Sequence, residues 1–144
     1  MDDNSRNISE VVGASTEKIQ NLIYVVRDRQ VMIDSDLAML YNVETKRLNE
    51  SVKRNIDRFP SNFRFQLSEE EASSLRSQFA TSKLAEENGK GGRRYLPYVY
   101  TEQGIAMLSA VLKSSVAIQV SIRIMNTFVE MRKYMANTSL MKQI

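Results

Sequence analysis

The chain has 144 residues, of which 42% are hydrophobic and 26% charged, and its 20 basic and 17 acidic side chains give a net charge of +3. This length and composition predict one globular domain with short appendages and no membrane span, because no apolar run approaches about 18 residues. The absence of cysteine excludes disulfides and thiolate zinc sites, and the absence of histidine removes the commonest general base and metal ligand. The polar N-terminus is no secretory signal, so we expect a cytoplasmic protein. Because histidine and cysteine are both absent, we do not expect an enzyme.

The first third of the chain predicts an arm followed by a β-hairpin. Residues 1–20 are expected to be a loosely ordered N-terminal arm, with a short helix beginning near Thr16. Residues 22–27 and 31–34 are rich in β-formers, and the turn residues 28–30 lie between them. The pattern predicts two short strands with a three-residue connection.

Two short helices with a tight turn between them are predicted next. Apolar side chains recur at helical spacing after Ser35, which is a favourable N-cap. Asn42 can adopt the left-handed conformation that ends a helix. Thr45 is then expected to cap a second helix that ends near Asn55. This arrangement is the helix-turn-helix pattern, in which the second helix enters the major groove of DNA.

The second predicted helix has an apolar stripe and a basic face. At 100° per residue its apolar positions fall within about 80°; they are Leu48, Val52, Ile56 and Phe59. We expect the residues at the start of the opposite face to meet bases and those further along to hold phosphates. The predicted DNA contacts are Thr45, Lys46, Arg47, Asn49 and Glu50, then Lys53, Arg54, Arg58 and Arg64. The alternative is an ordinary solvated helix whose cations pair with Glu50.

A strand, a helix and a basic loop follow. Residues 63–67 alternate apolar and polar side chains, which predicts a half-buried strand. Ser68 and Glu71 form a capping-box sequence at the start of a helix over 69–79. The polar loop 81–94 is expected to be wing-like or simply solvated, and its candidate DNA contacts are Lys90, Arg93 and Arg94.

The C-terminal third predicts one more strand and two helices. Pro97 cannot donate to a β-ladder, so its strand is expected at a sheet edge. Thr101 is suited to cap the following helix, and Ser114 or Ser115 the last one. Apolar side chains cover about 200° of that last helix, wider than a one-sided stripe. Either a second copy packs on residues 115–135, or the helix is central and fully covered by its own domain.

Three blocks of sequence carry a family resemblance. "VMIDSDLAMLYNVETKRLNESVKRNIDRFPSNFRFQL", "LRSQFATSK" and "GGRRYLPYVYTEQGIAML" occur in this order. Between about Leu22 and Leu112 the chain resembles the ORF-six-N branch of the KilA-N group, DNA-binding domains of phages, prophages and large DNA viruses. The resemblance implies an α+β fold and DNA binding. Asn42 stands where glycine is usual, and Tyr100 where phenylalanine is usual.

These observations lead to one set of expectations. The fold class is α+β, with a short β-hairpin, a helix-turn-helix, further short strands with a basic wing-like loop, and C-terminal helices. The expected parts are an arm (1–20), a DNA-binding domain (21–113) and a C-terminal helix (114–144) that is a candidate dimerisation element.

The expected function is that of a phage- or prophage-type transcriptional regulator that binds double-stranded DNA. An antirepressor-like protein-interaction module acting through the C-terminal helix is the alternative. A nuclease is disfavoured because no carboxylate constellation fits a two-metal site. No cofactor, metal, membrane or small-molecule partner is expected.

Overall fold

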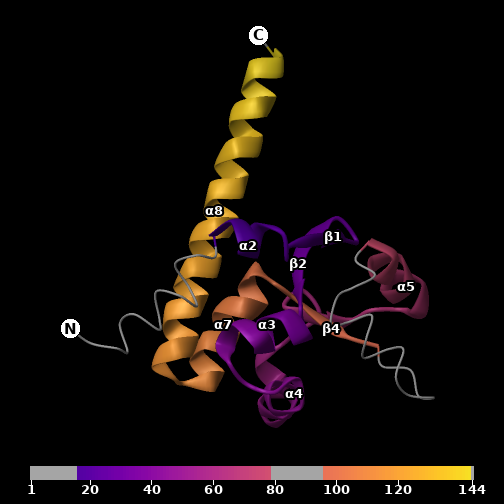
Figure 1. Ribbon diagram of the computed structural model, residues 1–144, viewed down its shortest axis with the longest axis vertical. Coiled ribbons are helices and arrows are strands. Elements are labelled where there is room, and N and C mark those ends of the chain that lie inside the picture. Colours follow the sequence, from indigo (N-terminus) through magenta and orange to yellow (C-terminus); the bar gives the residue numbers. More distant parts are fainter. Residues whose placement is uncertain (1–15, 79–95, 144) are drawn as a thin grey trace.

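The computed structural model describes residues 16–78 and 96–143, with side chains described to residue 135. This part of the chain has the predicted α+β fold, an antiparallel sheet of order β1-β2-β4-β3 with helices on both faces (Figure 1). The strands are β1 (Tyr24–Val26), β2 (Arg29–Ile33), β3 (Arg64–Gln66) and β4 (Tyr98–Thr101). The helices are α2 (Thr16–Gln20), α3 (Asp34–Tyr41), α4 (Thr45–Arg54), the 3-10 turn η2 (Ile56–Arg58), α5 (Glu69–Gln78), α7 (Glu102–Leu112) and α8 (Ser115–Gln143). The predicted wing-like loop lies outside the described residues.

The β-hairpin is confirmed, but its connection is shorter than predicted. Val26 pairs with Arg29, so only Arg27 and Asp28 form the turn. Both have positive φ angles, 54° and 61°, as the two-residue turn that matches strand twist requires. The prediction of three turn residues was wrong because two non-glycine residues adopt a conformation that usually calls for glycine or asparagine.

The strand after Pro97 lies in the middle of the sheet, so the predicted edge position was wrong. In β4, Tyr100 pairs with Met32 of β2 on one side, and Val99 pairs with Phe65 of β3 on the other. Pro97 precedes the strand, and its carbonyl accepts a hydrogen bond from the backbone N–H of Leu67 at 2.9 Å. Because the proline stands outside the ladder, its missing N–H leaves the strand pairing intact.

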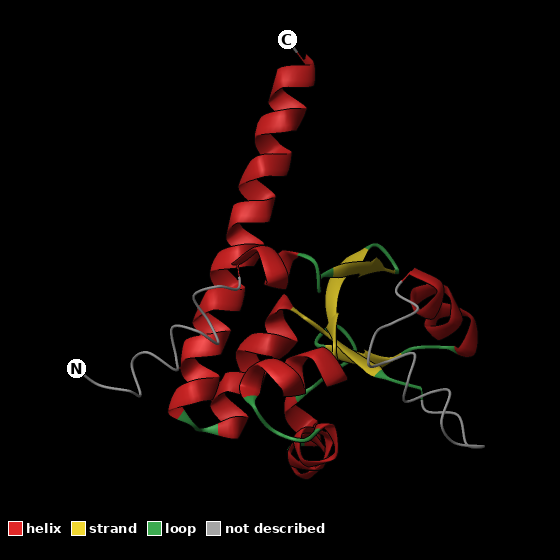
Figure 2. Ribbon diagram, in the orientation of Figure 1, coloured by secondary structure: helices red, strands yellow, loops and turns green. Residues whose placement is uncertain are grey.

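The larger core lies on one face of the sheet, where α3, α4, α7, α8 and α2 pack together (Figure 2). The buried spacing predicted for α3 is confirmed, with Leu37, Leu40 and Tyr41 all buried beside the small Ala38. Ile19 of α2 is also buried here, so this core begins before residue 21. Each fully buried aliphatic side chain stabilises the fold by roughly 2 kcal/mol.

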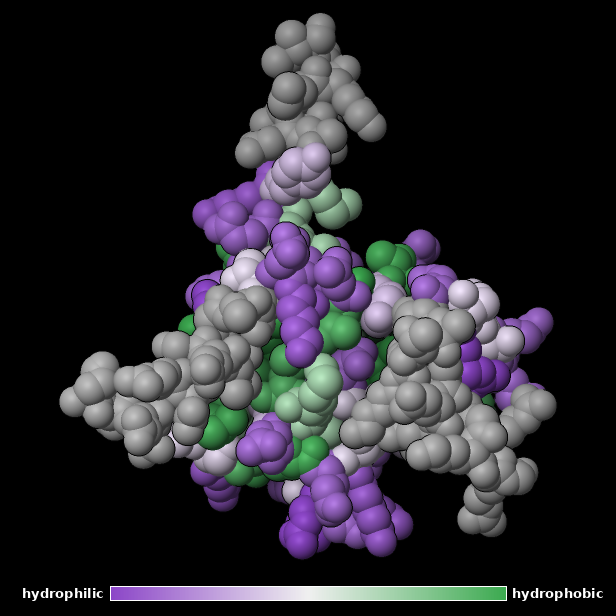
Figure 3. Space-filling view, viewed as in Figure 1, coloured by the Kyte–Doolittle hydropathy of each residue, from purple (hydrophilic) through white to green (hydrophobic). Residues whose placement is uncertain are grey.

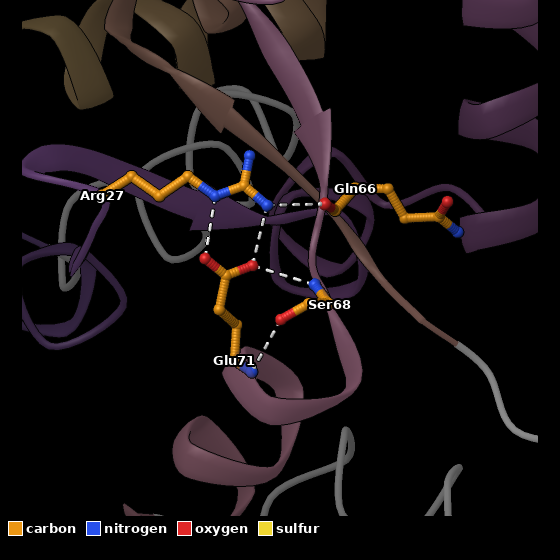
Figure 4. Close-up of polar contacts among 4 residues, drawn as sticks. All are labelled: Arg27, Gln66, Ser68 and Glu71. Carbon is orange, nitrogen blue, oxygen red and sulfur yellow. Dashed lines mark hydrogen bonds and ion pairs between the residues drawn. The ribbon is translucent and has the colours of Figure 1, made fainter.

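The opposite face of the sheet carries α5 and a smaller core (Figure 2). Ala72 and Leu75 of α5 are buried there against strand residues such as Val31 and Val99. Arg27 in the hairpin turn makes an additional contact, donating to both carboxylate oxygens of Glu71 at 2.8 and 2.9 Å (Figure 4). This ion pair ties α5 to the hairpin at the surface of the protein.

The hairpin contact also involves the start of α5. Glu71 accepts the backbone N–H of Ser68, and the Ser68 hydroxyl accepts the backbone N–H of Glu71, which confirms the predicted capping box (Figure 4). The Arg27 guanidinium lies 4.4 Å from the centre of the Phe65 ring. Hydrogen bonds from Arg27 are the main cause that lowers the pKa of Glu71 to about 2.

The junction of α3 and α4 is a three-residue turn. Asn42 has φ 60°, the predicted left-handed conformation, and the N–H of Val43 bonds to the carbonyl of Ala38. The predicted caps at Ser35 and Thr45 were wrong. Strand β2 runs directly into α3, so Ile33 occupies the N-cap position and Ser35 is buried inside the helix. Glu44 precedes α4 in the same way, and its side chain makes no capping hydrogen bond.

Helix α7 begins with the predicted Thr101 cap, whose hydroxyl accepts the N–H of Gly104. That hydroxyl also donates to the carbonyl of Asn62 at 2.8 Å, which holds the helix start against the chain entering β3. A methyl group on Gly104 would lie 2.0 Å from the carbonyl oxygen of Phe63. Only glycine therefore permits this close approach of α7 to the sheet.

Helix α8 is capped by Ser114, whose hydroxyl accepts the N–H of Ala117, and then runs to Gln143. Its N-terminal half packs on α7 and the core through buried residues that include Ala117, Ile124 and Phe128. Its C-terminal part projects beyond the rest of the domain (Figure 1). Ile118 and Ile122 are 46% and 51% exposed, so the expectation of a helix fully covered by its own domain was wrong.

Candidate nucleic-acid interface

Helix α4 is anchored by the apolar side that the sequence predicts. Leu48 and Val52 are completely buried, and Phe59 just beyond the helix is buried as well. Ile56 was wrongly included in this stripe, because it is 50% exposed. The α-helix ends at Arg54 and the chain tightens into η2, which moves Ile56 out of the helical register.

The outer side of α4 is charged and predominantly basic. Five of the predicted contact residues are exposed on it: Lys46, Arg47, Glu50, Lys53 and Arg54. Hydrophilic side chains project from the molecule where α4 lies, at the lower end of the view (Figure 3). The sequence prediction therefore placed four cations and one acid correctly on the solvent side of one helix.

Arg47 of α4 forms only a weak, exposed ion pair within the described residues. Arg47 forms a pair with Glu44 at 3.7 Å, and both side chains are nearly 80% exposed, at 78% and 79%. A pair this exposed contributes about 1 kcal/mol at most, so it is easily exchanged for a contact with another anion. Thr45, at the start of the helix, is half-buried and lines a shallow surface hollow with Met39 and Val43.

Asn49 differs from the other predicted contacts, because its side chain is turned toward the domain. Its amide Nδ2 donates to the Oδ2 atom of Asp34 at 2.9 Å, and its Oδ1 accepts from the Tyr100 hydroxyl at 3.4 Å. Asp34 is fully buried at the start of α3, and it also accepts the backbone N–H of Tyr98 at 3.3 Å. Both ends of the Asn49 amide are therefore used inside the protein.

Arg64 is also held inside this arrangement. Its Nε donates to the Tyr100 hydroxyl at 3.1 Å, and its guanidinium carbon lies 3.6 Å from the centre of the Tyr98 ring. Arg64 is half-buried in β3. A stacked guanidinium keeps its charge, but its position is fixed by the aromatic ring on which it lies.

Tyr100 is the centre of these contacts. Its ring is fully buried and meets Phe59 edge to face, with ring centres 6.0 Å apart. Burial raises the pKa of Tyr100 above its ordinary value, so the phenol keeps its proton and can donate it to Asn49. We define the polar relay as the four residues Arg64, Tyr100, Asn49 and Asp34.

The remaining predicted residues lie beside α4 or outside the described part of the chain. Arg58 in η2 is exposed and approaches the Met107 sulfur of α7 at 4.0 Å. Lys90, Arg93 and Arg94 lie outside the described residues. Sequence reasoning missed Asp34, Tyr98 and Tyr100. The signal for Asp34 is an acid at the end of the buried run "VMID", where a carboxylate requires polar partners.

Within residues 16–78 and 96–143, no helix combines the length and apolar character needed to cross a membrane. Nor do acidic side chains of the same ranges gather into a group that could hold a metal ion.

The fold and the site define a small α+β domain that presents one basic helix beside a sheet. The chain belongs to the ORF6N domain family: the family model matches residues 21–111, well over half of the chain. This confirms the resemblance to the ORF-six-N branch of the KilA-N group. No curated protein and no solved structure matches the chain.

Proposed function

We propose that this protein binds double-stranded DNA through the outer side of α4 and acts as a phage-type transcriptional regulator without catalytic activity. The observation that carries the proposal is the geometry of α4. Its inner side is fixed in the core by Leu48 and Val52, while its outer side offers four cations to solvent. Membership of the ORF6N domain family supports a nucleic-acid-binding role.

The three-residue turn between α3 and α4 supports a helix-turn-helix mode of binding. In this mode the second helix lies in the major groove, and the residues of its first turn reach base edges. Lys46 and Arg47 occupy that first turn, and Arg47 can form two hydrogen bonds to guanine. Lys53 and Arg54 lie about two turns further along, where we assign contacts with phosphates.

The test is a titration of fluorescent duplexes at several salt concentrations. Replacement of Arg54 by alanine should weaken binding to all sequences alike and lower the salt slope by about one charge, while Arg47→Ala should relax base preference. Lys18→Ala is the matched control, since it removes one exposed cation from α2, which packs on α8. Failure of the wild-type protein to bind any duplex at low salt would overturn the proposal.

A second candidate is self-association through α8. Ile118 and Ile122 are exposed, and Met125 and Val129 continue the same stripe at helical spacing of three or four residues. This spacing suits a helix that pairs with a second copy of itself. In light scattering, the wild type should have the mass of a dimer and Ile122→Lys that of a monomer. A monomeric wild type at high concentration would remove this candidate and the antirepressor-like alternative that depends on it.

A further inference from the structure

The polar relay connects four elements of the domain whose contributing residues are at least 15 positions apart in the sequence. It begins at Arg64 in β3, passes through Tyr100 in β4 and Asn49 in α4, and ends at Asp34 in α3. An arginine only donates hydrogen bonds and a carboxylate only accepts them, so the direction of every bond in the relay is fixed from both ends. Tyr100 must accept from Arg64 and donate to Asn49, and the Asn49 amide must turn its nitrogen toward Asp34.

The relay contacts α4 on a side of the helix that does not pack in the apolar core. Leu48 and Val52 bury one side of the helix, and apolar packing is non-directional. Asn49 lies about 100° around the helix from Leu48, at the border between the buried and exposed sides. Its hydrogen bonds are directional and connect to a fully buried carboxylate. Contacts at two separate points of the circumference oppose rolling of the helix about its own axis.

We propose that Asn49 and Tyr100 are positioning residues for the DNA-binding surface, because the polar relay fixes the rotation of α4 and so decides which of its side chains face the duplex. This inference rests on the proposed function of α4. It replaces the expectation that Asn49 reads a base. Recognition of adenine by asparagine uses both ends of the amide, and both ends of the Asn49 amide are engaged within the domain.

The test is a double-mutant cycle on the full chain with Asn49→Ala, Tyr100→Phe and the double variant. The probe is a duplex that the wild-type protein selects from random sequence, compared with an unselected duplex. Each single variant should bind the selected duplex about five- to tenfold more weakly, with little change for the unselected one. The double variant should lose no more than either single variant, since both remove the same relay.

Asn55→Ala is the matched control. Asn55 is a half-buried amide at the C-cap of α4, and it donates to the carbonyl of Ser51 within α4, outside the relay. It should retain wild-type selectivity. The proposal is overturned if Asn49→Ala changes preference at a single base pair while Tyr100→Phe binds like the wild type, because Asn49 would then be reading that base directly.

Amide hydrogen exchange in the free protein separates this inference from the proposed function. Both relay variants should speed exchange in α4 by a similar factor and leave α7 close to wild type. Unchanged exchange in α4, or an equal loss of protection in all helices, would overturn the positioning role even if DNA binding were established. If the wild-type protein binds no duplex but the relay variants show the selective increase of exchange in α4, the DNA-binding proposal is refuted and the mechanical role of the relay is supported.

Discussion

The two faces of the sheet are held to their helices by different kinds of contact. On the face of α3, α4, α7 and α8, a large apolar core is joined by the partly buried hydrogen bonds of the polar relay and by the buried pair Tyr41–Ser121. On the face of α5, a small apolar core is joined by the surface ion pair Arg27–Glu71. The basic helix therefore stands on the face whose contacts are less exposed to solvent, while α5 depends partly on a surface ion pair that salt and acid weaken.

The largest expected effect comes from Gly104→Ala, on the face of the larger core, because the backbone of α7 approaches the Phe63 carbonyl closely at this residue. The new methyl group would lie 2.0 Å from the Phe63 carbonyl, so α7 must move away from the sheet. We expect a loss of at least about 3 kcal/mol in the free energy of unfolding measured in urea. Ala110→Gly, an exposed change in the same helix, should cost only about 1 kcal/mol. Equal stability of the two variants would contradict the structure.

Replacement of one buried leucine by alanine on each face of the sheet allows the two cores to be compared directly. Leu48→Ala should cost about 3 kcal/mol and lower hydrogen-exchange protection throughout the larger core, because it leaves a cavity at a completely buried position. Leu75→Ala should cost about 2 kcal/mol and expose the amides of α5 selectively. If Leu75→Ala speeds exchange in α7 as much as in α5, the two faces form one cooperative unit and the comparison fails.

Removal of the buried hydrogen bond between Tyr41 and Ser121 tests the polar contacts on the face of the larger core. The two hydroxyl oxygens are 2.9 Å apart and join α3 to α8. Tyr41→Phe should cost about 1–2 kcal/mol, since the buried Ser121 hydroxyl loses its partner. Burial raises the pKa of Tyr41 to about 12, so this cost should be constant between pH 4 and pH 9. A cost that varies with pH across this range would argue against a buried, neutral pair.

The smallest effect is expected from Glu71→Gln on the opposite face. It should lower the free energy of unfolding by less than about 1 kcal/mol at pH 7, because solvent screens the pair. The pKa of Glu71 is lowered from 4.5 to about 2, so its stabilisation is fully present above pH 4.5 and is lost as the pH falls through 2. Urea midpoints of wild type and variant should converge as the pH falls toward 2 and in high salt. If the difference between the two urea midpoints increased as the pH fell, ionised Glu71 would not be stabilising the fold.

Local chemistry explains what the sequence could predict. Asn42, the Ser68–Glu71 capping box and the Thr101 cap were identified because each acts on backbone groups a few residues away. The apolar positions Leu48 and Val52 were likewise correct, since helical periodicity alone separates them from the basic side. The same periodicity failed at Ile56, where the helix had already ended.

Contacts between distant residues explain what could not be predicted. Asn49 was assigned to the DNA-facing side from its residue type, but its orientation depends on Asp34 and Tyr100, which are 15 and 51 residues away. Arg27 was read only as part of a strand, although it holds Glu71 from 44 residues away. Pairings at such separations depend on the topology of the sheet, for which neither periodicity nor capping gives a signal.

The continuity of α8 has a mechanical consequence. At about 1.5 Å per residue, a helix of 29 residues is a rod of about 43 Å. Its direction is set where residues such as Ala117 and Phe128 are buried in the core, and the helix continues without interruption into the projecting part. The part beyond Phe128 is 15 residues, or about 22 Å, so a rotation of a few degrees where the helix is held becomes a displacement of about 1–2 Å at Gln143, and α8 acts as a lever arm.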